Sequence, residues 1–206
     1  MQADRALTAY HEFAARYDER TRLINRMRLL AVAALELRPG DVVLDAGCGS
    51  GSCFAPVMQA IGPAGRLLAF DPSRDLLAIA RTRVAQAGWR NVELREGVAE
   101  TVRFGASADA LLLSYVHDVM QSEAALCNLL AQAKPGARVA GCGSVLWPWW
   151  GWPVNAWLRL RHRGYITQYA GLERPWAKLA PRLADFHAEV RWPPGWRYLA
   201  GGRVPV

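Results

Sequence analysis

The residues best placed to do chemistry form a run of glycines behind an acidic side chain. In the segment Val42-Val43-Leu44-Asp45-Ala46-Gly47-Cys48-Gly49-Ser50-Gly51, an aspartate follows three apolar residues and glycines then recur at every second position. Glycines allow the backbone to turn sharply and a ligand to approach closely. A helix that follows such a turn offers free N–H groups and the positive end of its dipole. The pattern therefore predicts a ligand-binding turn between a strand and a helix.

Two common nucleotide-binding motifs do not fit this turn. A GxGxxG motif that starts at Gly47 would need glycine where Ser52 stands, and one that starts at Gly49 would need it where Phe54 stands. A P-loop is excluded as well, because no GK[ST] sequence follows the glycines.

A second carboxylate follows the next apolar run. Asp71 ends the segment Leu67-Leu68-Ala69-Phe70-Asp71. A carboxylate at the end of a second parallel strand can accept hydrogen bonds from both hydroxyls of a ribose. An aspartate there can also simply cap a helix, but its register with Asp45 favours ribose binding. Pro72 would then flank the adenosine.

Candidate proton-transfer groups follow a later apolar run, in the segment Ser114-Tyr115-Val116-His117-Asp118. A histidine titrates near neutral pH, so His117 could act as a general base, with Asp118 or Tyr115 as alternatives. A His-Asp pair that only begins a helix is the competing interpretation.

Strands that alternate with helices would position these groups. Apolar runs predict buried strands over 42–44, 66–70, 92–95, 110–114 and 138–145. Helical patterns lie before, between and after them, over 4–37, 54–61, 73–87, 123–133, 154–163 and 174–186. Two closing strands are expected over 189–192 and 197–200. Apolar strands alternating with helices are typical of an α/β fold with a parallel sheet covered on both faces.

The arrangement Asp45-x-Gly47-x-Gly49-x-Gly51 resembles the first motif of the class I S-adenosylmethionine-dependent methyltransferases. The resemblance implies a Rossmann-like fold: a seven-stranded, mostly parallel sheet with an antiparallel final strand, plus N-terminal lid helices. It divides the chain into lid helices over 1–38 and a methyltransferase domain over 39–206, with an aromatic insert around 146–175.

The same resemblance implies S-adenosyl-L-methionine as cofactor and a set of contacts to it. The expected cofactor-binding residues are Tyr17, Asp45, Ala46, Gly47, Cys48, Gly49, Gly51, Asp71, Pro72, Val98, Ala99, Glu100 and Ser114. The chain departs from the family at Val98, which stands where an adenine-binding aspartate is usual. The backbone N–H of Ala99 could serve the adenine instead, and Glu100 is either a substitute or a solvent-exposed residue.

The segment from Tyr10 to Asp18 resembles the lid of the type 11/25 small-molecule methyltransferases, the group related to ubiquinone, menaquinone and phosphatidylethanolamine methylation. Tyr17 is the best candidate there for a lid residue over cofactor and substrate, and a further candidate for the catalytic base. The C-terminal motif typical of quinone methyltransferases is absent, which weakens a quinone assignment. The Asn/Asp-Pro-Pro-aromatic motif of DNA and adenine N-methyltransferases is absent too.

Composition bears on the substrate. Tryptophans gather between Trp147 and Trp152, and Arg159, Arg161 and Arg163 follow. Such a segment could line an apolar pocket, meet a membrane surface, or serve ordinary packing. We expect methyl transfer to a nitrogen, oxygen or carbon of a small, lipid-like or amphipathic molecule, a phospholipid headgroup or natural-product intermediate among them. The net charge of +7 keeps an RNA or protein methyltransferase open as an alternative, although no nucleic-acid partner is expected. A non-catalytic protein that binds S-adenosylmethionine is the third interpretation.

The cysteines and apolar runs bear on location. The four cysteines form no CxxC pair, so neither a disulfide framework nor a metal site is expected. No apolar run reaches the roughly 18 residues of a membrane span. We therefore expect a cytoplasmic protein, with peripheral contact at the inner membrane face left open along with the oligomeric state.

Overall fold

The computed structural model describes residues 25–146, 151–152, 155–156, 170–191 and 197–206. The predicted lid residue Tyr17, the helix expected over 154–163 apart from residues 155–156, and most of the tryptophan-rich segment lie outside these residues.

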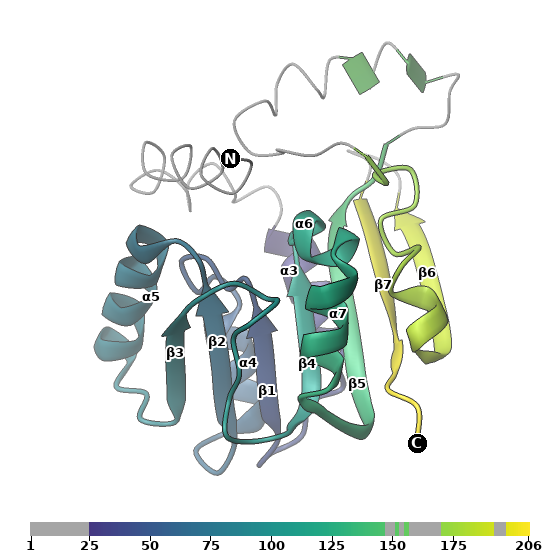
Figure 1. The fold of residues 1–206 in the computed structure, drawn as a ribbon. Coiled ribbons are helices and arrows are strands. Elements are labelled where there is room, and N and C mark those ends of the chain that lie inside the picture. Colours follow the sequence, from purple (N-terminus) through teal and green to yellow (C-terminus); the bar gives the residue numbers. More distant parts are fainter. Residues whose placement is uncertain (1–24, 147–150, 153–154, 157–169, 192–196) are drawn as a thin grey trace.

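The described residues form one seven-stranded sheet with helices on both faces (Figure 1). The strands are β1 (Val42–Ala46), β2 (Arg66–Asp71), β3 (Val92–Glu96), β4 (Ala108–Ser114), β5 (Ala133–Ser144), β6 (Ala184–Arg191) and β7 (Arg197–Arg203). Their order is β3-β2-β1-β4-β5-β7-β6. Strands β1 to β5 pair in parallel, while β7 runs antiparallel to both β5 and β6. The predicted α/β fold, with its antiparallel final strand, is confirmed.

Burial on both faces explains why the central strands are apolar throughout. Alternate residues of a strand point to opposite faces, and the core accordingly divides into two layers. Val43, Leu67 and Leu112 face the layer formed with α3 (Asn25–Ala34), α4 (Phe54–Ile61) and α5 (Arg74–Ala87). Leu44, Leu68 and Leu111 face the layer formed with α6 (His117–Gln121) and α7 (Glu123–Leu130). Because β1 to β5 are parallel, their carboxyl ends all lie on one side of the molecule, which is called here the carboxyl edge of the sheet.

Two serines begin the helices that follow this edge. The Ser73 hydroxyl accepts a hydrogen bond from the Leu76 N–H at 3.4 Å and caps α5. The Ser122 hydroxyl accepts one from the Ala125 N–H at 3.2 Å and caps α7. Each hydroxyl satisfies a backbone donor that has no partner within its helix.

Three predicted elements were wrong in part. The helix expected over 174–186 is instead a series of turns, the 3₁₀ helix Ala180–Arg182 and the first residues of β6. The helix expected over 123–133 ends at Leu130, and β5 begins at Ala133 rather than at Arg138. The Lys134-Pro135-Gly136 segment, which predicted a turn, lies in β5 where its pairing with β4 is irregular.

Within the part of the chain that the structure describes, we find no helix long and apolar enough to cross a membrane.

Candidate functional site

The glycine-rich turn joins the carboxyl end of β1 to α4. Gly47 has φ +66°, and a Cβ atom on it would lie 2.5 Å from Cγ1 of Val116. Gly51 has φ +77°, and its Cβ would lie 2.6 Å from the ring of Phe54. Both positions need glycine, because L-residues rarely adopt these angles and the added atom would clash. The turn is therefore packed tightly against Val116 and Phe54, with no room for a side chain at Gly47 or Gly51.

Asp71 ties this turn to the end of the neighbouring strand. Its Oδ2 accepts a hydrogen bond from the Gly49 N–H at 2.8 Å, and its Oδ1 accepts one from the Ser73 N–H at 2.8 Å. Burial raises the pKa of the Asp71 carboxyl, while these two N–H groups act against that shift. Each carboxylate oxygen can accept a further hydrogen bond. Asp71 therefore shapes the turn and retains acceptor capacity for a hydroxylated ligand.

Asp45 is buried beside it, with only 1% of its surface exposed. Among the described residues, its Oδ2 has no hydrogen-bond partner. Desolvation raises the pKa of Asp45 to about 7, the positive charge of Arg28 opposes this, and the charge of Asp71 adds to it. A buried carboxylate oxygen without a donor is costly, so the site is arranged to receive a hydrogen-bond donor, preferably a cation.

Arg28 is a site residue that the sequence did not predict. It projects from α3, is almost fully buried, and its Nη1 donates to Oδ1 of Asn25 at 3.0 Å. Its Cζ lies 5.7 Å from the centre of the Tyr115 ring. The only sequence signal was an arginine beside Met27 on an otherwise apolar helical face. Arg28 places a positive charge next to Asp45, at the same edge of the sheet.

The end of β4 presents a strained residue. Tyr115 has φ +59°, which is unusual for a bulky side chain. Its N–H donates to the Cys142 carbonyl at 2.8 Å, and the Ser114 Oγ lies 3.6 Å from the Cys142 Sγ. Tyr115 lies between the last residue of β4 and the start of α6. Strain of this kind clusters at functional sites.

His117 follows at the start of α6. Its Nε2 lies 3.0 Å from the carbonyl oxygen of Ala170. Because a carbonyl only accepts hydrogen bonds, Nε2 carries the proton in the neutral ring and Nδ1 has a free lone pair. Nδ1 is buried and has no partner among the residues the structure describes. Desolvation lowers the pKa of His117, although the Ala170 carbonyl and the charges of Asp118 and Glu173 oppose this. Asp118 itself is exposed.

The predicted adenine-side residues lie after β3. Val98 is 43% exposed, which is high for a valine. The carbonyl oxygen of Ala99 accepts a hydrogen bond from Asn128 Nδ2 at 2.8 Å, and this contact fixes the loop to α7. Glu100 accepts one from the Ser122 hydroxyl at 2.8 Å. The loop therefore exposes the apolar side chain of Val98, while Glu100 is already hydrogen-bonded to Ser122, the residue that caps α7.

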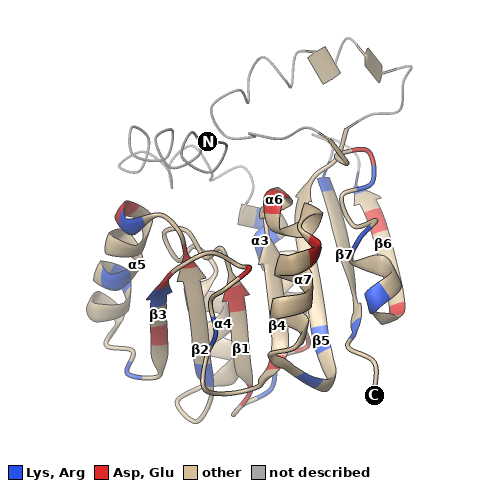
Figure 2. Ribbon diagram, viewed as in Figure 1, with Lys and Arg blue, Asp and Glu red and all other residues tan. Residues whose placement is uncertain are grey.

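The described candidates thus follow the carboxyl ends of β1, β2, β3 and β4. Figure 2 shows acidic residues at the ends of β1 and β2, which are Asp45 and Asp71. In open α/β sheets, ligands bind outside the carboxyl ends of the strands where the strand order reverses, here between β1 and β4.

Comparisons with known proteins bear on the family and the fold of the chain. The family model described as "Methyltransferase domain" matches residues 43–136. The chain is 30% identical to the ubiquinone/menaquinone biosynthesis C-methyltransferase UbiE of Pseudomonas fluorescens over 146 residues, which make up 67% of this chain and 57% of that protein. The chain therefore spans less than two thirds of the length of this relative.

Solved structures share the fold at low sequence identity. A SAM-dependent methyltransferase from Aquifex aeolicus superposes with a TM-score of 0.64 at 17% identity, covering 93% of this chain and 96% of that one. The N-methyltransferase NodS of Bradyrhizobium japonicum, solved in complex with S-adenosyl-L-homocysteine, superposes with a TM-score of 0.62 at 15% identity, covering 87% and 85%.

Proposed function

Because the chain belongs to the class I S-adenosylmethionine-dependent methyltransferases of the type 11/25 group, we propose that it transfers a methyl group from S-adenosylmethionine to a small or amphipathic molecule. The observation that carries the proposal is the pair of buried carboxylates, Asp45 and Asp71, on either side of a turn that excludes side chains.

The donor set fits this cofactor. The unpartnered Oδ2 of Asp45 suits the ammonium group of the methionine moiety, and the buried guanidinium of Arg28 suits its carboxylate. Asp71 has acceptor capacity left for ribose hydroxyls, and the exposed Val98 offers an apolar surface for the adenine ring. The turn presents backbone without side chains at Gly47, Gly49 and Gly51, which allows a ligand to approach the main chain closely.

When bound, S-adenosylmethionine supplies a methyl group on a positively charged sulfur. This sulfur leaves readily as the neutral thioether of S-adenosylhomocysteine. The protein's main contribution is then to align the acceptor and to exclude water. A hydroxyl or carbon acid would in addition need a base, and Nδ1 of His117 provides a buried lone pair at the same edge of the sheet. Tyr115 and Asp118 are the other described candidates, and Tyr17 remains a proposal.

Substrate class is proposed on two grounds. The relatives named above include a C-methyltransferase of quinone biosynthesis, which makes an apolar ring compound with an activated carbon a good first test. The tryptophan-rich segment suits an apolar or lipid-like acceptor as well. We prefer either to the amine of an extruded nucleobase, since the sequence lacks the motif that holds such a base. An RNA or protein acceptor stays the alternative that the net charge of +7 suggests.

Cofactor binding is tested by calorimetry with S-adenosylmethionine and S-adenosylhomocysteine. Asp45→Asn and Asp71→Asn should weaken both affinities at least about tenfold, because each removes a charged hydrogen-bond acceptor. Glu189→Gln, on the outer strand β6, is the matched control and should change neither. Absence of binding by the unaltered protein would refute the proposed function.

Methyl transfer is tested with labelled cofactor and a panel of quinone precursors, phospholipids, hydroxylated and amine metabolites, and RNA. Label in a small or lipid-like molecule is the expected result. Label in RNA alone would contradict the proposed substrate class, and binding without turnover on any member would favour a non-catalytic role.

A further inference from the structure

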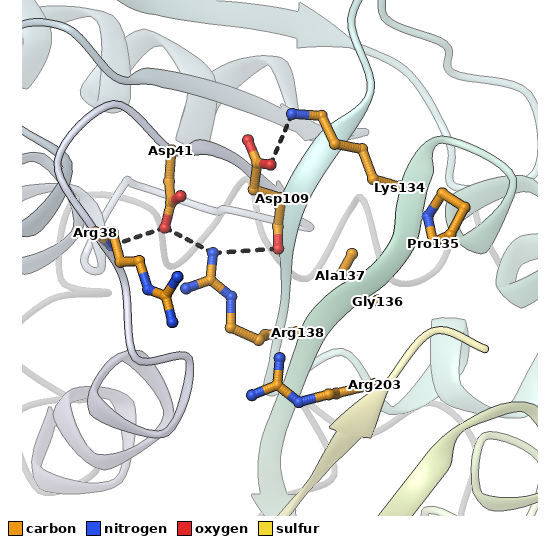
Figure 3. A pocket seen from close by; sticks show the side chains of 9 residues that line it. All are labelled: Arg38, Asp41, Asp109, Lys134, Pro135, Gly136, Ala137, Arg138 and Arg203. Atoms are coloured by element: carbon orange, nitrogen blue, oxygen red, sulfur yellow. Dashed lines mark hydrogen bonds and ion pairs between the residues drawn. The ribbon is translucent and has the colours of Figure 1, made fainter. Parts of the chain in front are cut away.

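A second polar pocket lies at the opposite end of the sheet, at the amino ends of the parallel strands (Figure 3). It has a volume of about 220 Å³. Four cationic and two acidic side chains line it: Arg38, Lys134, Arg138, Arg203, Asp41 and Asp109. The positive charges in the pocket therefore outnumber the negative ones. None of the candidate cofactor-binding residues lines this pocket.

Both carboxylates serve to hold the pocket in shape. Asp41 accepts hydrogen bonds from the Arg38 N–H and from Nη2 of Arg138, each at 2.7 Å. Asp109 accepts bonds from the Val42 N–H at 2.9 Å and from Nζ of Lys134 at 2.6 Å. The ion pair with Lys134 helps to lower the pKa of Asp109, so this carboxylate stays ionised. Each acid is thus already matched by donors.

Arg138 is likewise fixed in place. It is largely buried, and it donates from Nη1 to the carbonyl of Glu36 at 2.6 Å as well as to Asp41. Arg138 therefore holds a fixed positive charge in the pocket and connects β5 with the segment before β1.

Two other guanidinium groups of the pocket, those of Arg38 and Arg203, have no close carboxylate partner among the described residues. Within the described residues, no carboxylate pairs with the Arg38 side chain. Arg203 has only a long contact of 3.8 Å with Glu36, whose side chain is 71% exposed. Figure 3 shows the Arg38, Arg138 and Arg203 side chains approaching the same opening from three segments of the chain. Figure 2 shows this positive charge at the lower ends of β5 and β7.

We propose that this pocket binds a phosphate group, with Arg38 and Arg203 as its ligands and Arg138 beneath them. Guanidinium groups match the oxygens of phosphate in charge and geometry. The volume is below the roughly 300–1,000 Å³ of pockets for drug-sized ligands, which suits a small ion such as phosphate or pyrophosphate. S-adenosylmethionine carries no phosphate, so this site is separate from the cofactor crevice and does not rest on the proposed methyl transfer.

The experiment is calorimetric titration of the whole protein with sodium pyrophosphate, at an ionic strength held constant with sodium chloride. The protein is saturated with S-adenosylhomocysteine, so that the crevice is filled and cannot contribute. We expect one bound pyrophosphate per chain, and a dissociation constant that rises at least about tenfold in the Arg38→Gln/Arg203→Gln variant, which loses both ligands.

The matched control is Arg81→Gln/Arg90→Gln, which removes two exposed arginines on and after α5 and keeps the same net charge as the test variant. Arg38 and Arg203 are also exposed, so both variants should fold, which circular dichroism checks. If the pyrophosphate titration gives no more heat than a titration with sodium chloride alone, the proposal is wrong. Equal weakening in both variants would overturn it too, because binding would then follow net charge rather than the pocket.

Discussion

Asp45 and Asp71 lie in the same crevice but differ in how their charges are satisfied. Asp71 accepts two backbone N–H groups, while Oδ2 of Asp45 accepts none among the described residues. Burial consequently raises the pKa of Asp45 to about 7. Asp45 is therefore a residue that costs stability in the absence of ligand and gains a partner when one binds, a combination common at functional sites.

The raised pKa gives Asp45 a predictable effect on stability. The folded protein holds the Asp45 proton up to about pH 7, whereas the unfolded chain releases it near the ordinary pKa of an aspartate, 3.8. Its contribution to stability is therefore fully present below the unfolded pKa and is lost as pH rises through the folded one. Asp45→Asn imitates the protonated acid, so above pH 7 the variant should be the more stable protein.

The difference in unfolding free energy between Asp45→Asn and the unaltered protein, measured with urea at several pH values, should grow between pH 4 and pH 7. Each pKa unit is worth about 1.36 kcal/mol, so the gain is on the order of a few kcal/mol. The same variant should bind S-adenosylhomocysteine more weakly. A difference that does not change with pH would contradict the assigned ionisation.

His117 supports a kinetic prediction. If the acceptor needs a base, His117→Gln should lower kcat by about 10²–10⁴-fold with unchanged affinity for S-adenosylhomocysteine. Burial lowers the pKa of His117 below the ordinary histidine value of 6.5, so the acidic limb of the kcat–pH profile should lie below that pH. His187→Gln, on β6, is the control and should leave the profile in place. Unchanged turnover in His117→Gln would remove its role.

The sequence predicted both carboxylates but not their partners. A motif reports residue types at a spacing, and Asp45 and Asp71 stand at recognisable positions after apolar strands. Arg28 could not be found this way, because its role depends on α3 packing against β4, β5 and β7. Likewise, the hydrogen bond from the Gly49 N–H to Asp71 depends on a tertiary contact that no local pattern encodes, whereas the one from Ser73 is local.

At the scale of elements, the turn between β1 and α4 fits against the loop after β4. The closest contact is at Gly47, where a Cβ would approach Cγ1 of Val116 to 2.5 Å. The turn and the loop after β4 can therefore pack together only because residue 47 is glycine.

Gly47→Ala should therefore lower the free energy of unfolding by more than a conformational cost alone. The matched control is Gly88→Ala, which has nearly the same φ, +68°, but nothing within 4 Å of its Cβ. It should lose about 1 kcal/mol, and Gly47→Ala should lose about 1–3 kcal/mol more, as overpacking does. Urea unfolding measures both.

The clash itself is tested by a double-mutant cycle. Adding Val116→Ala to Gly47→Ala removes the Cγ1 atom that the new Cβ would meet, and should recover part of the loss. If the two substitutions are simply additive, the contact between the turn and the β4 loop is not the cause.

The error over 174–186 shows the limit of periodicity. Trp176, Leu179 and Leu183 recur at helical spacing, and all three do pack on the core. Pro175 and Pro181 lie among them, however, and a proline in a helix interior removes a hydrogen bond and clashes with the preceding turn. The chain instead brings these apolar side chains to the core through turns and a 3₁₀ helix. Buried side chains were predicted correctly, but the backbone path was not.

At the scale of the whole molecule, the sheet separates two chemically different ends. Its carboxyl ends carry buried carboxylates for a cationic cofactor, and its amino ends carry the arginine-lined pocket. Between these ends, the central strands β1, β2 and β4 are largely apolar and buried on both faces. Such a division suits independent sites, because a well-packed sheet has no second arrangement through which one end could bias the other.

The whole-molecule prediction is that S-adenosylhomocysteine stabilises the entire sheet as one unit. A ligand that binds only the folded state at 100 times its dissociation constant adds about 2.7 kcal/mol to the free energy of unfolding. The gain should appear equally by circular dichroism of the helices and by hydrogen exchange of β2 and β5, because both core layers rest on the same strands. Asp71→Asn should lose most of the gain at that ligand concentration, whereas Glu189→Gln should keep it. Protection confined to the turn and to β1 would show that the crevice opens locally, and that the sheet does not respond as a unit.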